Sequence, residues 1–399
     1  MTNNLSNKTK KKILIFSTAY YPFVGGAEVA VKEITDRLSK DFNFEFDLIT
    51  AKLRKDLPNV EKVGSVNVYR LGIGRPLFDK LILPFRGAFL ARRLNKKADY
   101  FCLWGIMVTF GSLAGYLFNI LQVLTRKKKI PIVLTLQEGD SENHLQYKWI
   151  GLIALSWKLS LWRTDFLTGI SNFLLNRAKK NGYKGKYSLV PNGVDLSIFS
   201  QQINLEIKNN LKNSLGKKSN DIFLVTSGRL TRKNAIDDVI SALVYLPKNV
   251  YFIIIGKGEE GPCLQKQAQT LKVDDRVKFL GFISYQDIPR YFSICDVFIR
   301  PSRSEGFGNS FIEAMASGLP VIATPVGGIP DFIDDKETGV FCSPDNPQSI
   351  VKAIGLILND NVLRERIIYK AYERVKERYG WDHIAGQMKA VFDKISHNE

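Results

Sequence analysis

The chain has 399 residues, 45% of them hydrophobic and 24% charged, a composition that is typical of globular proteins and excludes a disordered chain. At about 150 residues per domain, this length favours two domains over a single core. Of the net charge of +18, residues 1–200 carry +16, with 31 Lys or Arg against 15 Asp or Glu. This asymmetry indicates that the first half faces a polyanion. An anionic membrane surface is favoured, because no nucleic-acid-binding motif is present.

The first half alternates short apolar runs with helical stretches, which predicts a parallel sheet with helices on both faces. The predicted strands are Ile13–Ser17, Phe46–Thr50, Val66–Arg70, Tyr100–Trp104, Ile132–Leu136, Leu167–Ile170 and Tyr187–Val190. A polar stretch, Gln201–Asn220, follows and indicates a linker with a solvated helix.

A second alternating series predicts a second sheet of the same kind. Its strands are Ile222–Ser227, Val250–Ile255, Val277–Leu280, Asp296–Ile299, Pro320–Ala323 and Gly339–Phe341. The last helix, from about Trp381 to Ser396, follows a Tyr379-Gly380 break and is expected to cross back to the first domain. We therefore predict an α/β protein of two facing, doubly wound domains, 1–198 with 381–399, and 199–380.

Phe101–Leu124 has no charged residue and is long enough to span a bilayer. A strand-like start, the break at Gly105 and the following strand favour a buried strand plus a crossover helix instead. The N-terminus has no signal-peptide core, and Cys102, Cys263, Cys295 and Cys342 show no metal-like or paired spacing. We expect a cytoplasmic protein with reduced core thiols.

The most informative stretch runs from Arg300 to Ala323 and places Glu305 and Glu313 on either side of a Gly-rich turn. Gly306 and Gly308 allow a tight turn, and Ser310 is expected to cap a helix that ends at about Ser317. Amides at such a helix start suit a diphosphate, and the two carboxylates suit a sugar and a ribose. Alternatively, Ser310 and Glu313 form only a capping box.

Further glycines and cations follow other predicted strands. Gly25 and Gly26 lie between the first strand and the first helix, where glycines let amides approach an anionic ligand closely, although a plain strand-to-helix turn fits equally. Gly228, Arg229 and Lys233 follow the first strand of the second series, and Gly256 follows the next. We expect the two cations to neutralise a leaving diphosphate, although a solvated basic turn also fits.

No Asp-x-Asp pair occurs, and the three histidines have no ligand spacing. We therefore expect neither a metal nor another cofactor.

In this order, these motifs together with Pro191-Asn-Gly-Val-Asp195 resemble the retaining glycosyltransferases of family 4, which have the GT-B fold. The resemblance covers nearly the whole chain. It implies that a sugar moves from a nucleotide diphosphate to an acceptor hydroxyl with retention of anomeric configuration, and that the leaving phosphate accepts the acceptor proton.

The resemblance assigns Arg229 and Lys233 to the donor diphosphate, Glu305 to the transferred sugar and Glu313 to the ribose. The remaining expected donor-binding residues are Gly25, Gly26, Gly228, Gly256, Gly306, Phe307, Gly308, Asn309 and Ser310.

The chain departs from the family where relatives have a histidine, because Gln137 stands there, with Asp140 as a further candidate sugar or acceptor contact. Gln137 forms hydrogen bonds but does not titrate. Asn234 replaces a frequent glycine, and asparagine tolerates left-handed backbone.

Acceptor recognition is expected in the first domain. Arg75–Arg93 and the stretch with Trp149, Trp157 and Trp162 combine cations with bulky apolar groups. Such segments suit the inner face of a membrane and a saccharide or lipid-linked acceptor of envelope or polysaccharide synthesis, but a helix packed on its own core fits equally.

Other functions that fit the sequence are a sugar-nucleotide epimerase or phosphorylase on the same scaffold, or a catalytically silent glycan- or membrane-binding scaffold.

Overall fold

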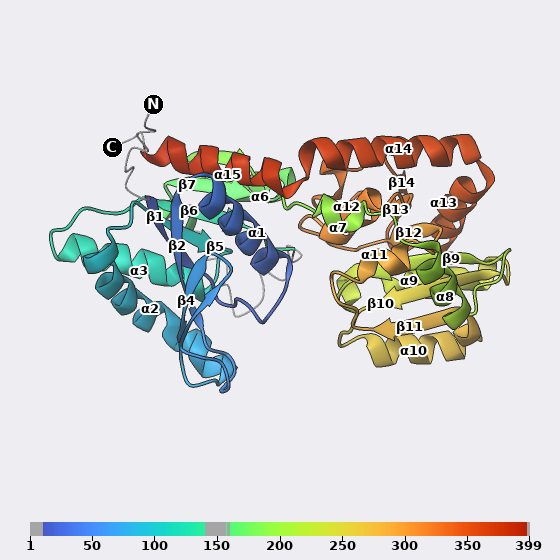
Figure 1. The fold of residues 1–399 in the computed structure, drawn as a ribbon, viewed down its shortest axis with the longest axis horizontal. Coiled ribbons are helices and arrows are strands. Elements are labelled where there is room, and N and C mark those ends of the chain that lie inside the picture. The colour runs from blue at the N-terminus through green and yellow to red at the C-terminus, as the bar shows by residue number, and fades with distance from the viewer. Residues whose placement is uncertain (1–10, 140–156, 158–159, 397–399) are drawn as a thin grey trace, which may run out of the picture. The chain divides into compact units, whose positions relative to one another are not determined.

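The computed structural model describes residues 11–139, 157 and 160–396, and it divides into two compact units (Figure 1). Unit 1 is Met1–Asn192 with Trp381–Glu399, and unit 2 is Gly193–Gly380. The division falls before the expected residue 198 because Val194 pairs with Gly380 of unit 2, and Phe199 packs on Tyr285 and Phe292.

Unit 1 contains an eight-stranded sheet with the order β3-β4-β2-β1-β5-β6-β7-β8. Its strands are β1 (Lys11–Phe16), β2 (Phe44–Ala51), β3 (Val60–Val63), β4 (Val66–Leu71), β5 (Cys102–Ile106), β6 (Ile132–Leu136), β7 (Phe166–Gly169) and β8 (Lys186–Leu189). All neighbours are parallel except β3, which pairs antiparallel with β4 and was not predicted.

Helices cover both faces of this sheet. They are α1 (Gly26–Asp41), α2 (Pro76–Ala98), α3 (Phe110–Leu124), α6 (Asn172–Lys180) and α15 (Trp381–Ser396). Alternate residues of β1 point to opposite faces: Ile13 and Ile15 join a core with α1 and α15, whereas Leu14 and Phe16 join a core with α2 and α3. The prediction of a buried strand followed by a crossover helix at Phe101–Leu124 is thus confirmed.

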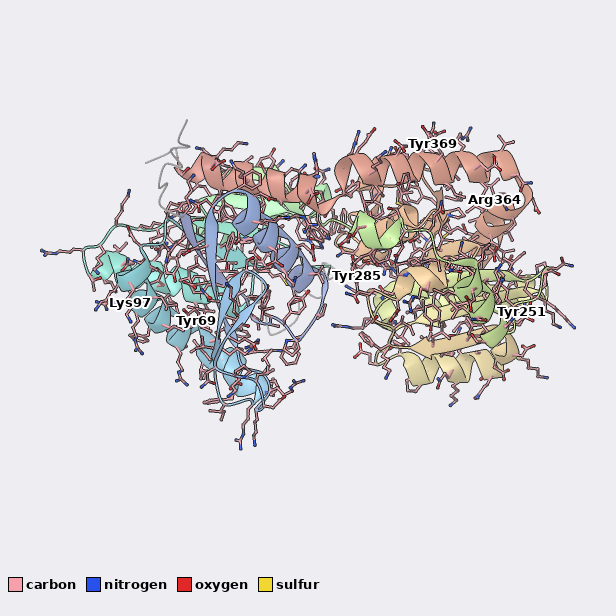
Figure 2. All side chains as sticks on the ribbon, viewed as in Figure 1. Tyr69, Lys97, Tyr251, Tyr285, Arg364 and Tyr369 are labelled. Carbon is pink, nitrogen blue, oxygen red and sulfur yellow. The ribbon has the colours of Figure 1, made fainter. Side chains whose placement is uncertain are left out.

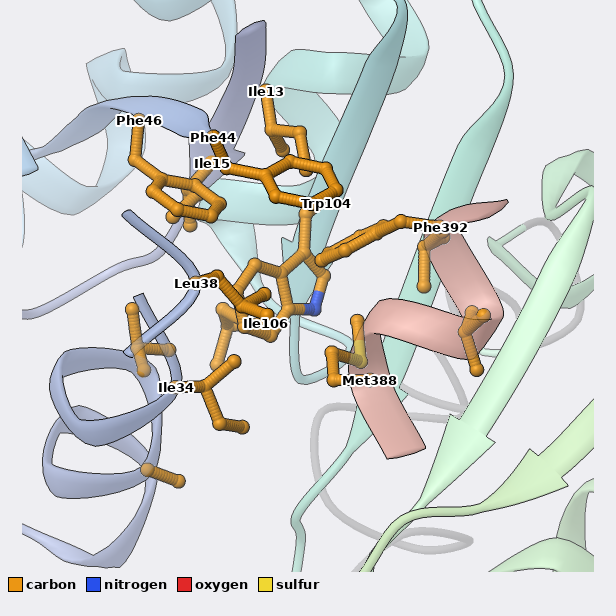
Figure 3. Packing of buried hydrophobic residues seen from close by; sticks show 14 of the residues in the cluster. Ile13, Ile15, Ile34, Leu38, Phe44, Phe46, Trp104, Ile106, Met388 and Phe392 are labelled. Atoms are coloured by element: carbon orange, nitrogen blue, oxygen red, sulfur yellow. The ribbon is translucent and has the colours of Figure 1, made fainter. Parts of the chain in front are cut away.

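The last helix belongs to the core of unit 1, as predicted. Figure 3 shows Phe392 and Met388 of α15 beside Trp104 of β5, and the rings of Trp104 and Phe392 lie 5.5 Å apart in an edge-to-face arrangement. Phe392 also packs on Phe44 of β2, at 5.9 Å. Aromatic burial of this kind anchors the helix on the sheet.

Unit 2 contains a six-stranded parallel sheet with the order β11-β10-β9-β12-β13-β14. Its strands are β9 (Ile222–Ser227), β10 (Val250–Ile255), β11 (Val277–Gly281), β12 (Val297–Arg300), β13 (Val321–Ala323) and β14 (Val340–Phe341). Its α-helices are α7 (Leu196–Phe199), α8 (Leu205–Ser214), α9 (Ile236–Ala242), α10 (Gly261–Thr270), α11 (Ile288–Phe292), α12 (Asn309–Ala316), α13 (Pro347–Asn359) and α14 (Asn361–Arg378). The 3-10 turns are η1 (Arg232–Asn234), η2 (Leu243–Tyr245), η3 (Asp274–Arg276) and η4 (Ile329–Asp331).

α8 buries none of its residues, as expected for a solvated helix in the linker. Cys263 is exposed on α10, so it is not the core thiol that its sequence suggested. Trp157 is buried whereas Trp162 is exposed, so the aromatic stretch does not present both to solvent; Trp149 lies outside the described residues. No helix among the described residues has the length and apolar character needed to cross a membrane.

Candidate active site

The strand order of unit 2 reverses between β9 and β12. From β9 the chain moves outward to β10 and β11, and from β12 it moves the other way to β13 and β14. Loops that leave the carboxyl ends of β9 and β12 therefore diverge and leave room for a ligand, as at other switch points of open α/β sheets. The motifs around Arg229 and Glu305 are these two loops, so the structure brings them together.

Arg300, the last residue of β12, organises the loop that follows it. Its buried guanidinium donates to Glu305 Oε2 at 2.8 Å, to Ser310 Oγ at 2.7 Å and to the Ser227 carbonyl at 3.3 Å. The Gly306 amide donates to the other Glu305 oxygen at 3.1 Å. Both oxygens of Glu305 are therefore fixed in place, although sequence reasoning gave Arg300 no role. The signal for such a role in the sequence was the position of a cation at the end of an apolar strand.

Burial raises the pKa of Glu313 to about 7, while the charge of Arg300 opposes the rise. Within the described residues, the Glu313 carboxylate accepts no hydrogen bond. The capping-box alternative is wrong, because α12 begins at Asn309 after a left-handed Gly308 without a side-chain cap, and the Ser310 hydroxyl is occupied by Arg300. Glu313 is thus an available acid in the second turn of α12.

The two cations after β9 differ from a neighbouring arginine. Arg303 contacts the carboxylates of Asp237 at 2.8 Å, Asp238 at 3.0 Å and Asp345 at 2.5 Å. In contrast, Arg229 is exposed and Lys233 half-buried, and neither forms an ion pair with any described residue. The charge of Arg303 is neutralised by carboxylates within the fold, whereas the charges of Arg229 and Lys233 remain available to an anion.

Close backbone contacts hold the cation-bearing loop in place. The Lys233 carbonyl accepts the Arg303 amide at 2.7 Å, which ties this loop to the one after β12. The buried Asn234 side chain donates to the Arg229 carbonyl at 2.6 Å. Asn234 does not use its tolerance of left-handed backbone, because it lies in η1 and Ala235 takes the left-handed conformation with φ 53°.

Glycines permit the close approach of these loops. A Cβ on Gly256, at φ +135°, would lie 1.9 Å from the Gly228 carbonyl oxygen, and one on Gly327, at φ +58°, would lie 1.8 Å from the Glu305 carbonyl oxygen. The expected Gly256 is therefore a packing requirement between the loops after β9 and β10. Phe307 is buried against Phe332, at 5.1 Å, and Tyr379, so its ring supports the turn.

Several buried polar atoms at this sheet edge have no hydrogen-bond partner among the described residues. They are Thr226 Oγ1, Ser227 Oγ, Thr231 Oγ1, Arg300 Nε and Ser302 Oγ. Buried polar atoms are rarely left without partners, because the lost hydrogen bonds are costly. In the described part of unit 2, the buried side-chain polar atoms without a partner all lie at this edge.

The corresponding edge of unit 1 is of different character. Gly25 is extended, with φ −137°, and Gly26 is the first residue of α1. A Cβ on Gly25 would lie 2.8 Å from the Glu28 carboxylate, so an acidic group already occupies the start of this helix. An anion at this helix start would therefore meet a negative charge.

Gln137 and Glu138 follow β6 at this edge. The Asn192 side chain donates to Gln137 Oε1 at 3.4 Å. Glu138 is buried and accepts the amides of Val108 and, at 3.0 Å, Gln137; burial raises its pKa, against these hydrogen bonds. Sequence reasoning passed over Glu138, although an acid directly after a buried strand was a signal. Asp140 lies outside the described residues.

Across residues 11–139, 157 and 160–396, no group of three or more His, Cys, Asp or Glu is placed to hold a metal.

Two doubly wound parallel sheets, with available cations and a fixed glutamate at the switch point of the second, define a GT-B type of protein. The model of the family "Glycosyltransferase Family 4" matches residues 24–198, and that of "Glycosyl transferases group 1" matches residues 207–374. The chain belongs to glycosyltransferase family 4 and is a glycosyltransferase.

Known proteins resemble the chain over nearly its whole length. It is 27% identical to an uncharacterized glycosyltransferase of Methanocaldococcus jannaschii, over 96% of this chain and 97% of that protein. It is 25% identical to alpha-monoglucosyldiacylglycerol synthase of Acholeplasma laidlawii, over 88% and 89%. The solved structure of Anabaena HepE in complex with UDP and glucose has the same fold, with a TM-score of 0.75 and 20% identity, over 96% and 100%.

Proposed function

We propose that the protein is a retaining glycosyltransferase that transfers a sugar from a nucleotide-diphosphate donor to a saccharide or lipid-linked acceptor hydroxyl. The observation that carries the proposal is the pair of cations without ion-pair partners in the described residues, Arg229 and Lys233, beside the fixed Glu305 at the switch point of unit 2. Each part of the donor then has a chemically matched group.

The diphosphate is the anionic part of the donor. Arg229 and Lys233 would neutralise the charge that develops on it as the sugar departs, and a charge-stabilising group of this kind contributes about 10²–10³-fold to turnover. The start of α12 adds backbone amides that favour an anion. These groups supply positive charge, so our proposal assigns no divalent metal to the site.

The two glutamates would contact the uncharged parts of the donor. Glu305, fixed by Arg300 and the Gly306 amide, would accept hydrogen bonds from the transferred sugar. Glu313, without a hydrogen-bond partner in the described residues, would accept from the ribose hydroxyls. A protonated Glu313 would accept fewer hydrogen bonds, so its raised pKa makes donor binding sensitive to pH near 7.

The reaction breaks the bond between the anomeric carbon and the phosphate oxygen and forms a bond from the acceptor oxygen on the same face of the sugar. The acceptor proton moves to the leaving phosphate oxygen. Glu305 therefore acts as a contact to the sugar and not as the general base, in accordance with its two engaged oxygens.

The acceptor class follows from the basic first half and from a relative. Alpha-monoglucosyldiacylglycerol synthase of Acholeplasma laidlawii is by its name an enzyme of glycolipid synthesis. We place the reaction at the cytoplasmic face of a membrane, in the synthesis of a glycolipid or cell-surface polysaccharide.

The test is a thermal-shift and hydrolysis screen with UDP-, GDP-, ADP- and dTDP-linked sugars, first with EDTA and then with Mg²⁺. We expect one donor to raise the melting temperature and to release its nucleoside diphosphate slowly in EDTA. Proton NMR of the transfer product then gives its anomeric configuration. Failure of every donor, with and without Mg²⁺ and acceptor, would favour a catalytically silent scaffold, and inversion would refute the retaining mechanism.

A further inference from the structure

Two neighbouring helices of unit 1 cover the same face of its sheet. The inner sides of α2 and α3 join one core, to which α2 contributes Leu83 and Ala88, and α3 contributes Phe118. The helices also pack on each other: a Cβ on Gly87 of α2 would lie 2.8 Å from the Cβ of Ala114 on α3. The outer sides of both helices therefore point away from the same face of the sheet.

These outer sides are apolar to an unusual degree. The exposed large apolar side chains are Leu77, Phe78, Leu81, Phe85 and Phe89 on α2, and Phe110, Leu113, Ile120, Val123 and Leu124 on α3. The spacing of three and four residues from Phe78 to Phe89 places them on one side of α2. Phe85 is 64% exposed and Phe89 60% exposed. We call these ten residues the α2–α3 face; an apolar patch of this kind marks an interaction site.

The segment that carries the α2–α3 face is rich in positive charge. Residues 75–129 contain eleven Lys or Arg and only two acidic residues, Asp79 and Asp99. Asp79 does not offset this charge at the surface, because it is buried and accepts the amides of Leu53, Ile73 and Gly74. In the described part of the chain, no ion pair is formed by Lys80, Arg86, Arg92, Arg93, Lys96, Lys97, Arg126 or Lys127.

The charge is concentrated at one end of the helix pair. α2 and α3 each connect two parallel strands, so both helices run from the carboxyl edge of the sheet to its amino edge. The cations of the last turns of α2 and those that follow α3, at 126–129, therefore lie at the same end. Figure 2 shows the side chain of Lys97 on the outer side of α2.

We propose that the α2–α3 face docks the protein on a bilayer that contains anionic lipid. Aromatic and aliphatic side chains would enter the boundary between headgroups and acyl chains, and the flanking Lys and Arg would contact anionic headgroups. A protein partner fits less well, because protein interfaces are depleted in Lys and rich in specific hydrogen bonds, whereas the outward side chains of this face have no polar groups.

The docking has a consequence for the reaction, which rests on the proposed function. The first turn of α3 contacts the loop after β1: the Gly111 amide donates to Thr18 Oγ1 at 3.1 Å. The apolar start of α3 thus lies at the carboxyl edge of the unit 1 sheet, the edge of Gln137 and Glu138. A lipid-linked acceptor in the docked membrane would present its saccharide at this edge.

The test is co-sedimentation of the full chain with vesicles of phosphatidylcholine alone or mixed in equal parts with phosphatidylglycerol. It needs no donor or acceptor, so its outcome is independent of the proposed reaction. We expect the wild-type protein to bind the mixed vesicles and to be released by high salt. The double variant Phe85→Asp/Phe89→Asp should bind at least about tenfold more weakly, because it removes two inserted rings. The variant Arg92→Gln/Arg93→Gln should also lose about tenfold on the mixed vesicles, because each basic residue adds to the attraction.

The matched control is Val362→Asp/Tyr369→Asp on α14 of unit 2, where the two side chains are 78% and 67% exposed and Tyr369 lies on the outer side of the helix (Figure 2). This control should bind like the wild type, and circular dichroism and melting should show that every variant folds. Absence of wild-type binding to either vesicle, or equal binding by all folded variants, overturns the proposal. A vesicle-independent dimer that Phe85→Asp/Phe89→Asp dissociates would instead assign the face to self-association.

Discussion

The carboxyl edges of the two sheets carry opposite chemistry although they share one architecture. At the edge of unit 2, Arg229 and Lys233 lack carboxylate partners among the described residues, and Glu305 is fixed by a buried arginine. At the edge of unit 1, Glu28 occupies the start of α1, and Glu138 is held by backbone amides. We therefore expect the anionic donor to bind at unit 2 and an uncharged saccharide to bind at unit 1.

The same comparison applies within unit 2 to its arginines. Arg303 meets three carboxylates and joins the loops after β9 and β12, whereas Arg229 lies beside them without an ion pair in the described structure. Proximity to the site therefore does not identify a ligand-binding cation. We expect the absence of internal ion-pair partners to distinguish a ligand-binding cation from a structural one.

We expect the largest effect on turnover from the substitution Lys233→Ala. We predict that kcat/KM for the donor falls about 10²–10³-fold, because a cation that stabilises the leaving group is lost. The melting temperature should not change, because the side chain makes no ion pair with described residues. Initial rates and thermal melts measure both quantities. Lys248→Ala, in the turn before β10 at the opposite edge of the same sheet, is the matched control and should retain full activity.

Arg303→Ala should behave in the opposite way. The buried carboxylate of Asp238 loses its cation, which should lower the free energy of unfolding by about 1–3 kcal/mol. Chemical denaturation measures this loss, and Arg229→Ala provides the comparison, with no expected change in stability. Equal stability of the two variants would contradict the division into structural and ligand-binding arginines.

Glu313→Gln tests the acidic group with the raised pKa. Because the pKa in the folded protein is about 7, above the ordinary value of 4.5, the unfolded state loses this proton first. The free energy of unfolding therefore falls as pH rises from 4.5 to about 7 and stays level above that. The variant should therefore melt at a higher temperature than the wild type at pH 8, and the difference should shrink as pH falls towards 4.5.

Donor binding should show the complementary pH dependence. If the ionised carboxylate accepts from the ribose, affinity in the wild type should fall by up to about tenfold per pH unit below 7 and level off above it. Glu313→Gln should flatten this profile and bind about tenfold more weakly at pH 8. A wild-type profile that is already flat between pH 5 and 8 would argue against ribose binding by Glu313.

The smallest expected effect belongs to unit 1. Gln137→Ala removes one neutral hydrogen-bonding group, so kcat/KM for the acceptor should fall roughly threefold to tenfold. Donor binding in the absence of acceptor should not change. Steady-state kinetics with varied acceptor, together with donor titration, separates the two. If Gln137→Ala lost as much donor affinity as Lys233→Ala, this result would contradict the assignment of Gln137 to the acceptor rather than the donor.

The alternation of strands and helices was sufficient to predict both sheets and the return of the last helix, because buried parallel strands are continuous apolar runs. The edge strand β3 was not predicted because its four residues, Val60–Val63, are exposed or partly exposed and two of them are charged. The motif residues of unit 2 were found because they follow predicted strands. The sequence did not predict the partners of those residues. The hydrogen bond from Arg300 to Ser310 and the three acids around Arg303 depend on tertiary packing.

The sequence also did not predict individual backbone conformations. The spacing of Ser310 and Glu313 satisfied a capping box, and only the left-handed Gly308 and the competing Arg300 exclude it. Similarly, Asn234 was a better candidate for left-handed backbone than Ala235, yet its side chain is required to hold the Arg229 carbonyl. In both cases a contact distant in sequence decided between two locally acceptable arrangements.

The most direct test of the account is calorimetric titration of the donor found in the screen, in EDTA, into the wild type, Lys233→Ala and Lys248→Ala. We predict equal affinity for the wild type and Lys248→Ala, and affinity at least about tenfold weaker for Lys233→Ala, because an available cation at the carboxyl edge of unit 2 binds the diphosphate. Equal affinity of all three proteins would contradict the assignment of the donor site to this edge.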